Sequence, residues 1–171
     1  MKLRSLVAAA FLLSTLSLSA LAASFSAGIN ISEDASPEQT GLRIYPGATV
    51  VVKNKGNDAT ADIQFSFGEY GLKVVVAKLR TSDAPSKVAE FYRNELKQFG
   101  EILDCSTATT AAKTPAQRDK SKTLTCDGKK PSKGGMLYKA GQKDDQRTVE
   151  IKSMGEGSEF SLVYVRVRSP D

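Results

Sequence analysis

Two cysteines, Cys105 and Cys126, are the residues of this chain whose chemistry is easiest to define. They are the only cysteines, and no histidine accompanies them. A redox pair usually presents closely spaced cysteines, and a zinc site needs about four ligands. An even pair in an oxidising compartment forms a disulfide instead. We therefore predict a structural Cys105–Cys126 bridge, which stabilises the fold by about 3 kcal/mol in the chain-entropy model.

Acid–base chemistry has little support in the sequence. The absence of histidine removes the commonest general base and the Ser-His and Cys-His nucleophile arrangements. Neighbouring acids at Glu33-Asp34 and Asp144-Asp145 lie in polar, turn-rich stretches, where acids are usually solvated. Gly134-Gly135 and Gly155-Glu156-Gly157 lack the spacing of a phosphate-binding loop. We therefore predict no catalytic or metal-binding residues and no cofactor.

Basic residues are concentrated in one segment of the chain, and this uneven distribution of charge points to a partner. Between residues 113 and 143, nine basic side chains are accompanied by only two acids, Asp119 and Asp127. Such a patch attracts anionic envelope polymers, lipid head groups or an acidic protein. It lacks the interleaved aromatic residues that stack on bases, so nucleic acid is not expected. The alternative is a solvated, lysine-rich loop. The candidate anion-binding residues are Lys113, Arg118, Lys120, Lys122, Lys129, Lys130, Lys133, Lys139 and Lys143.

Residues 1–22 have the pattern of a signal peptide for export. Lys2 and Arg4 precede an apolar run, and Ala20-Leu21-Ala22 is the small-x-small pattern that a signal peptidase requires. The apolar run is shorter than the ~20 residues that a membrane span needs. We predict cleavage near Ala22 and a periplasmic or secreted product that is not a transmembrane protein.

Signal cleavage would leave a chain of ordinary domain size. Loss of Lys2 and Arg4 lowers the formal charge from +5 to +3, so whole-chain basicity is a weak clue. Residues 23–40 are rich in Ser, Ala, Gly and acids without a sustained period, which predicts a flexible N-terminal arm. Residues 41–171 are expected to form a single α+β domain.

Three strand signals precede the expected helix. The chain is extended on both sides of a Pro46-Gly47 turn or bulge, from residue 42 to residue 53. Ile63, Phe65 and Phe67 alternate with polar residues, as in a strand with one buried face. The valine run from Leu72 to Leu79 predicts a central strand that is covered on part of both faces.

One helix is expected from near Asp83 to Gly100. The Asp83 carboxylate can cap free amide donors, and Pro85 fits the first turn, where its missing N–H does no harm. Apolar residues recur at three- and four-residue steps and form one stripe, which we interpret as core packing against a sheet and not as a ligand box. The stripe consists of Val88, Phe91, Tyr92, Leu96 and Phe99.

The remaining elements complete an antiparallel sheet. Residues 101–105 and 123–126 look like two strands joined by a loop that the predicted bridge tethers. Residues 136–140, 147–152 and 159–168 are three more strand candidates, and the short turns between them imply antiparallel pairing. The chain is therefore predicted to form an α+β fold, a largely antiparallel sheet of six or seven strands with one long helix on one face.

Four motifs carry a resemblance to a known group of proteins. They are Tyr45-Pro46-Gly47-Ala48, the helix segment Val88-Ala89-Glu90-Phe91-Tyr92, the cysteine pair, and the terminal Leu162-Val163-Tyr164-Val165-Arg166. Together they resemble a family of small exported bacterial proteins that lack an assigned activity. The resemblance covers most of the mature chain and implies no catalytic residues.

Two functions of different classes fit these observations. The first is a noncatalytic periplasmic or secreted binding or structural module, whose sheet face or basic segment engages an anionic envelope component or another exported protein. The alternative is a carboxylate-dependent enzyme that acts on an envelope polysaccharide or a similar substrate. A pocket with two facing carboxylates would favour the enzyme, whereas a packed sheet with scattered surface acids would favour the module.

Overall fold

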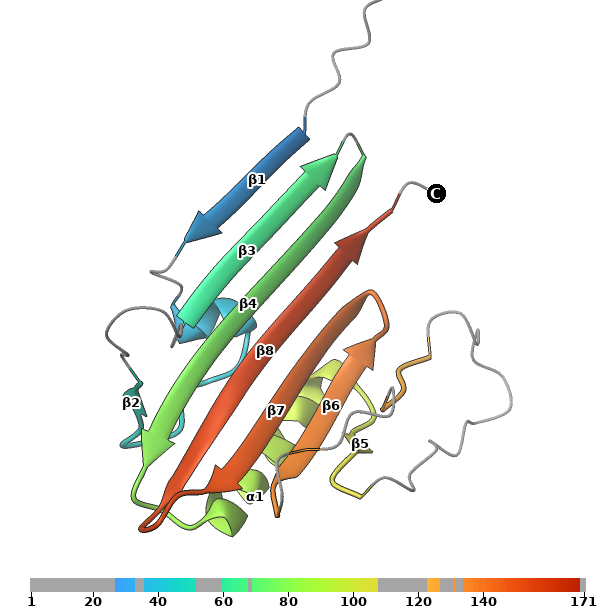
Figure 1. Ribbon diagram of the computed structural model, residues 1–171. Helices are drawn as coiled ribbons and strands as arrows, with labels where there is room; N and C mark the ends of the chain where they lie inside the picture. The colour runs from blue at the N-terminus through green and yellow to red at the C-terminus, as the bar shows by residue number, and fades with distance from the viewer. Residues whose placement is uncertain are drawn as a thin grey trace, which may run out of the picture.

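One antiparallel sheet organises the chain. The computed structural model describes residues 27–32, 36–51, 60–67, 69–107, 123–126, 131 and 134–169. Within these residues the strands follow the order β1-β3-β4-β8-β7-β6-β5, and β2 pairs with β4 beyond the end of β3 (Figure 1). This architecture confirms the predicted α+β fold. The strands are β1 Ala27–Ser32, β2 Thr49–Val50, β3 Thr60–Phe67, β4 Tyr70–Thr81, β5 Leu103–Asp104, β6 Met136–Gln142, β7 Asp145–Ser153 and β8 Ser158–Arg168.

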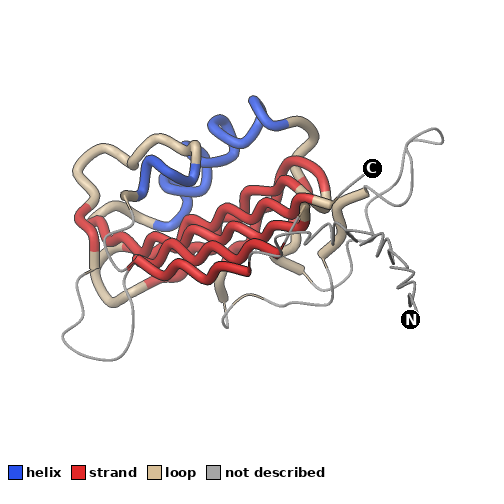
Figure 2. Tube along the Cα trace, turned by 90° about the horizontal axis from the view of Figure 1, so that it is seen from above, coloured by secondary structure: helices blue, strands red, loops and turns tan. Residues whose placement is uncertain are grey.

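The predicted helix is present and lies on one face of the sheet. It comprises α1, Pro85–Leu96, and a short 3-10 helix, η2, Lys97–Phe99; a second 3-10 helix, η1, Pro37–Thr40, lies on the same side (Figure 2). Pro85 occupies the first turn as predicted, but Asp83 does not cap the helix, because the cap position falls on Ala84. The Asp83 carboxylate instead accepts hydrogen bonds from the Tyr45 hydroxyl and the Lys87 ammonium.

The apolar stripe of α1 forms the core with the sheet. Val88, Tyr92 and Leu96 are fully buried, and Phe91 and Phe99 are partly buried against the same cluster. The facing sheet residues of this core are Ala77, Leu79, Tyr138, Ala140, Val149, Ile151, Phe160 and Leu162. Core packing therefore explains the aromatic residues of the stripe, as predicted.

The prediction of a flexible arm over residues 23–40 is wrong where the structure describes this segment. Residues 27–32 form β1, which pairs antiparallel with β3 and satisfies the backbone groups along that edge. Pro37 and Thr40 are buried in η1, and the Thr40 hydroxyl donates to the Pro37 carbonyl at 2.7 Å. Residues 23–26 and 33–35 lie outside the described residues.

The extended run expected around Pro46-Gly47 is mostly irregular. Residues 42–45 are not a strand, because Leu42 and Tyr45 insert into the core between the helix and the sheet. The turn itself is confirmed by the hydrogen bond from Ala48 N–H to the Tyr45 carbonyl at 3.0 Å and by the positive φ of Gly47. Only Thr49–Val50 pairs as a strand. Residues 123–126, which were expected to form a strand, do not form one.

Candidate anion-binding site

The two cysteines form the predicted disulfide. The Cys105 and Cys126 Sγ atoms are 2.09 Å apart, and Cys105 is fully buried. The bridge holds residues 123–126 against β6, where the Thr125 carbonyl accepts a hydrogen bond from the Lys139 ammonium at 3.0 Å. Its role in this arrangement is structural, because it fixes a segment that covers part of the sheet.

The basic segment predicted from the sequence is only partly described. Lys113, Arg118, Lys120, Lys122, Lys129, Lys130 and Lys133 lie outside the described residues. Lys143 is exposed in the turn between β6 and β7. Lys139 is buried, with 5% of its surface exposed, because residues 123–126 cover it. Lys139 therefore does not contribute to an exposed patch, and the prediction that it is an anion-binding residue is wrong.

Two buried carboxylates, those of Glu95 and Glu159, are neutralised by basic neighbours, whereas one oxygen of the buried Asp62 carboxylate has no hydrogen-bond partner among the described residues. Arg43 donates two hydrogen bonds to Glu95, at 3.0 Å and 2.5 Å, and these bonds hold the pKa of Glu95 below its ordinary value. Burial opposes ionisation of Glu159, but hydrogen bonds from Lys152 and Arg80 outweigh it and lower the pKa of Glu159. Both groups are therefore ion-pair partners that stay charged near neutral pH.

The candidate acid pairs are not brought together as a catalytic site. Residues 33 and 34 lie outside the described residues. The Asp144 carbonyl accepts a hydrogen bond from Val167 N–H, and the Asp145 carboxylate pairs with Arg147. Among the described residues, no cluster of three or more acids and cysteines could hold a metal ion.

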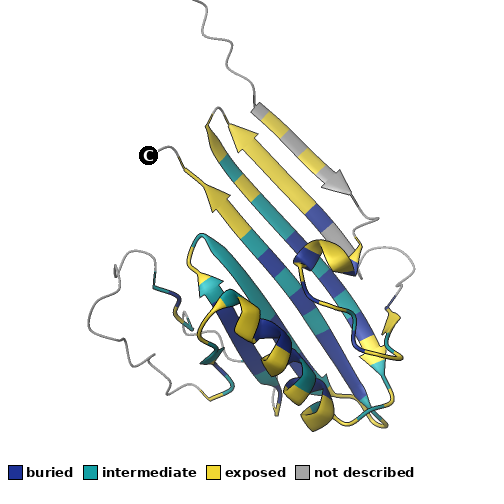
Figure 3. Ribbon diagram, turned by 180° about the vertical axis from the view of Figure 1, so that it is seen from behind, coloured by how far each residue is buried: buried dark blue, intermediate teal, exposed yellow. Residues whose placement is uncertain are grey.

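A shallow hollow lies on the helix face of the sheet, beyond the end of the core. The helices cover only part of this face, so the strand ends near the β3–β4 turn are exposed (Figure 3). We call this part of the sheet the open half. The hollow has a volume of about 680 Å³, and its polar and basic lining residues come from four strands. The full lining consists of Gly28, Asn30, Gln64, Phe65, Ser66, Gly71, Leu72, Lys73, Arg166 and Arg168.

Strand register places the polar, basic and glycine residues of this lining in two rows across the sheet. Asn30, Gln64, Lys73 and Arg166 are successive cross-strand neighbours in one row. The second row is Gly28, Ser66, Gly71 and Arg168. Glycine keeps the second row shallow, because a Cβ at Gly71 would lie 3.7 Å from the Arg168 guanidinium and would occupy the space beside it. Arg168 therefore lies beside Gly71, and Lys73 and Arg166 stand in the adjacent row.

The electrostatics of the hollow favour an anion. Lys73 lies 3.5 Å from the buried Asp62 carboxylate, which offsets part of its charge. Arg168 donates from Nε to the Glu69 carbonyl at 3.2 Å, a bond that positions the guanidinium without neutralising it. Arg166 is exposed on β8 between Lys73 of β4 and Asp145 of β7, and the Asp145 carboxylate is paired with Arg147. Arginine presents several donors in a planar fork that matches carboxylate and phosphate geometry.

Arg147 stands opposite Tyr164, in the cross-strand row next to that of Arg166 and Lys73. Its guanidinium carbon lies 4.2 Å from the Phe99 ring centre and 4.3 Å from that of Tyr164, so the cation is held between two aromatic faces. Because this charge is also paired with Asp145, it is committed to the structure and is not available to a ligand.

Sequence reasoning did not find the hollow, because its residues are spread along the chain. Lys73 and Arg166 are far apart in sequence and meet only through the pairing of β4 with β8. A signal does exist in the alternation of Arg166 and Arg168 with Val165 and Val167, which places both arginines on one face of an extended strand.

Comparisons with known proteins give one weak structural likeness. No protein-family model and no curated protein matches the chain. The chain is similar to a solved structure of LpqN, a protein involved in cell envelope biogenesis of Mycobacterium tuberculosis, with 11% identity and a TM-score of 0.29. The match covers 85% of this chain and 73% of LpqN. A likeness at this level carries no functional argument. Within the described part of the chain, no helix has both the length and the apolar character needed to cross a membrane.

Proposed function

We propose that the protein is an exported, noncatalytic binding module that holds phosphate or carboxylate groups of an anionic envelope polymer in the hollow of its open half. The observation that carries this proposal is the position of Lys73, Arg166 and Arg168 around one hollow, on a part of the sheet that none of the described helices covers. A hollow of about 680 Å³ is within the range of ligand sites and accommodates a few units of a polymer.

The state of the carboxylates supports binding over catalysis. A general acid or base works best with a pKa near the operating pH, which usually requires a raised carboxyl pKa. Here the pKa values of Glu95 and Glu159 are lowered by basic neighbours. No carboxylate is among the residues that line the hollow. Neither these two carboxylates nor the lining of the hollow therefore supports the alternative of a carboxylate-dependent enzyme.

Export is part of the same proposal. It is supported by the signal pattern of residues 1–22 and by the disulfide, since such bonds persist in oxidising compartments. Intact-mass measurement of the protein from its host should give a chain that begins at or near Ala23. A product that retains the apolar run would contradict export.

The binding test uses two polymers that separate the possible anionic groups. Polyphosphate and polygalacturonate are titrated against the mature protein by calorimetry at low and at physiological salt. Replacement of Arg166 and Arg168 by glutamine should weaken binding at low salt by about tenfold or more, because charge-assisted hydrogen bonds are lost. Binding by the unchanged protein should also fall as salt screens the exposed charges.

A matched variant controls for net charge. Lys87→Gln with Lys97→Gln removes the same charge from exposed positions of the helix, outside both the hollow and the basic segment, and should leave binding nearly unchanged. Equal weakening by both double variants would overturn the proposal, because it would show attraction to overall charge only. A loss seen only after replacement of Lys129, Lys130 and Lys133 would assign binding to the basic segment instead. New reducing ends in polygalacturonate would favour the enzyme.

A further inference from the structure

The outer face of the sheet, opposite the helices, carries an exposed apolar patch in its open half. Six side chains there are each between 38% and 56% exposed: Ile63, Phe65, Phe67, Tyr70, Leu72 and Val167. We call these residues the outer patch. The outer face is turned towards the viewer in Figure 1, with α1 behind β6 and β7.

Strand register makes the outer patch continuous. Phe65 stands opposite Leu72, and Leu72 stands opposite Val167. In the adjacent rows Phe67 pairs with Tyr70, and Ile63 with Val74. Cross-strand partners project from the same face, so these rows form one surface without a charged side chain.

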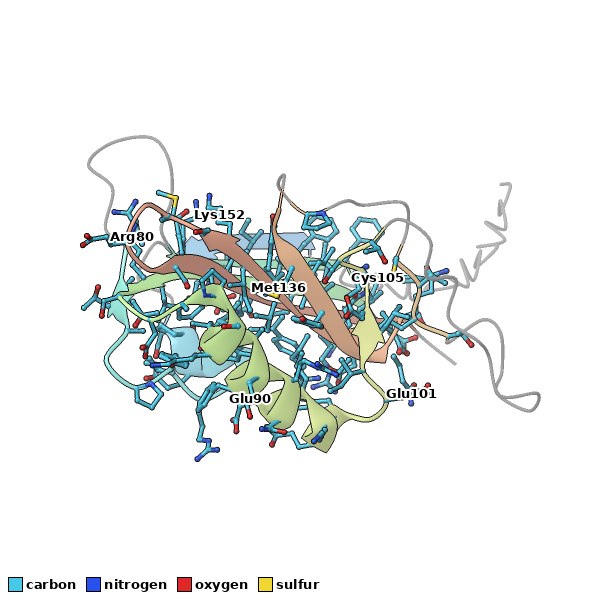
Figure 4. All side chains as sticks on the ribbon, turned by 90° about the horizontal axis from the view of Figure 1, so that it is seen from below. Arg80, Glu90, Glu101, Cys105, Met136 and Lys152 are labelled. Carbon is cyan, nitrogen blue, oxygen red and sulfur yellow. A yellow bond between two sulfur atoms is a disulfide. The ribbon has the colours of Figure 1, made fainter. Side chains whose placement is uncertain are left out.

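The same face is ionic at the other end of the strands. Arg80 and Lys152 both pair with Glu159 there, at 2.9 Å and 2.8 Å. Arg80 and Lys152 lie on the side of the sheet away from α1, from which Glu90 projects (Figure 4). The outer patch therefore has a defined boundary. About halfway along β4 and β8, the apolar side chains change from the helix face to the outer face of the sheet.

The outer patch is about as large as the largest apolar patch of a typical monomer, which is often a functional surface. Aromatic side chains carry about 150–250 Å² each, so Phe65, Phe67 and Tyr70, at 41%, 40% and 56% exposure, present roughly 250 Å². With the three aliphatic members the area reaches roughly 500 Å², which is near the upper end for the largest patch of a monomer. Two such patches in contact would bury about 1,000 Å², the size at which specific interfaces begin.

We infer that the outer patch is the contact surface between two copies of this chain. Two sheets that pack face to face lie about 10 Å apart with their strands within about 30° of each other. An uncharged sheet face is suited to this packing, and a twofold arrangement would bury the patch of both copies at once.

This arrangement leaves the proposed anion sites free. Lys73, Arg166 and Arg168 project from the helix face of the same strands. In the dimer the helix face of each copy would point to solvent, so both hollows would remain accessible. Two sites on one particle would bind a long polymer more tightly than a single site. The dimer itself rests on the outer patch alone and does not depend on the proposed function.

The test is the oligomeric state of the mature protein, measured by sedimentation velocity from low micromolar to near-millimolar concentration. We expect a monomer–dimer equilibrium. Phe65→Glu with Leu72→Glu should abolish the dimer, whereas Met154→Glu with Val50→Glu should not, because those exposed apolar residues lie outside the patch. A monomer at every concentration, or a dimer that the patch variant leaves unchanged, would overturn the inference.

A second measurement keeps the test decisive if the charged variant unfolds. Leu72→Cys should be joined between copies by a short bis-maleimide, whereas Met154→Cys should not; the two native cysteines are occupied by their disulfide. Absence of the Leu72 cross-link would count against the dimer. Monomeric protein that floats with phosphatidylglycerol vesicles and loses this property in the Phe65→Glu variant would assign the patch to a membrane instead.

Discussion

Leu72 and Lys73 are consecutive residues of β4 that project from opposite faces of the sheet into opposite environments. Leu72 contributes to the uncharged outer patch, whereas Lys73 lines the hollow and pairs with Asp62 at 3.5 Å. Farther along the same strand the relationship is reversed, because Leu79 is buried against the helix and Arg80 joins the outer ion pairs. One end of β4 therefore contributes to the core, and the other end contributes to the outer patch on one face and to the hollow on the other.

This reversal predicts unequal costs for the same substitution at two positions of β4. Leu79→Ala should lower the free energy of unfolding by about 2–5 kcal/mol, because it leaves a cavity in the core. Leu72→Ala should cost less than about 1 kcal/mol in dilute monomer, where this residue remains exposed. Urea denaturation at low protein concentration measures both. Equal costs at the two positions would show that something covers the outer patch within one chain.

The sequence predicted those parts of the fold whose signals are local. The spacing of Val88, Tyr92 and Leu96 was sufficient for the helix, and the valine run of β4 correctly indicated a central strand. Its cover is on one face only, because Val75, Ala77 and Leu79 are buried on the helix face and Leu72 is exposed on the other. β1 was missed because a short segment containing Gly28 and Asn30 has little apolar character and is fixed by pairing with a distant strand. The hollow was missed for the same reason, since β4 and β8 must pair before it exists.

A buried hydroxyl predicts a second stability effect. The Tyr92 hydroxyl accepts a hydrogen bond from the Tyr45 backbone N–H at 3.2 Å, and both residues are buried. Tyr92→Phe should therefore cost about 1–3 kcal/mol, because a buried donor is left without an acceptor. Tyr164→Phe is the control, since no comparable bond of its hydroxyl is seen within the described residues, and it should cost less than about 0.5 kcal/mol. Equal chemical-denaturation midpoints for the two variants would contradict this assignment.

The disulfide predicts a loss of stability on removal. Cys105→Ala with Cys126→Ala should cost about 3 kcal/mol, because the unfolded chain regains the freedom of the closed loop. Reductant should destabilise the unchanged protein to a similar degree and leave the double variant unaffected. Thiol titration of unreduced, denatured protein from its native compartment should find no free cysteine. Two reactive thiols there would contradict a native bridge.

The Arg43–Glu95 pair predicts how stability responds to acid. Hydrogen bonds from Arg43 lower the folded-state pKa of Glu95 below the ordinary value of 4.5, so the unfolded chain binds more protons in that range. The contribution of the pair is therefore fully present above pH 4.5 and is lost as the pH falls through the lowered pKa. Glu95→Gln should be less stable than the unchanged protein at neutral pH and should lose less stability between about pH 5 and pH 3. Glu90→Gln, an exposed change on the same helix, should keep the original dependence. Parallel curves of unfolding free energy against pH for Glu95→Gln and the unchanged protein would show that this pair does not govern acid stability.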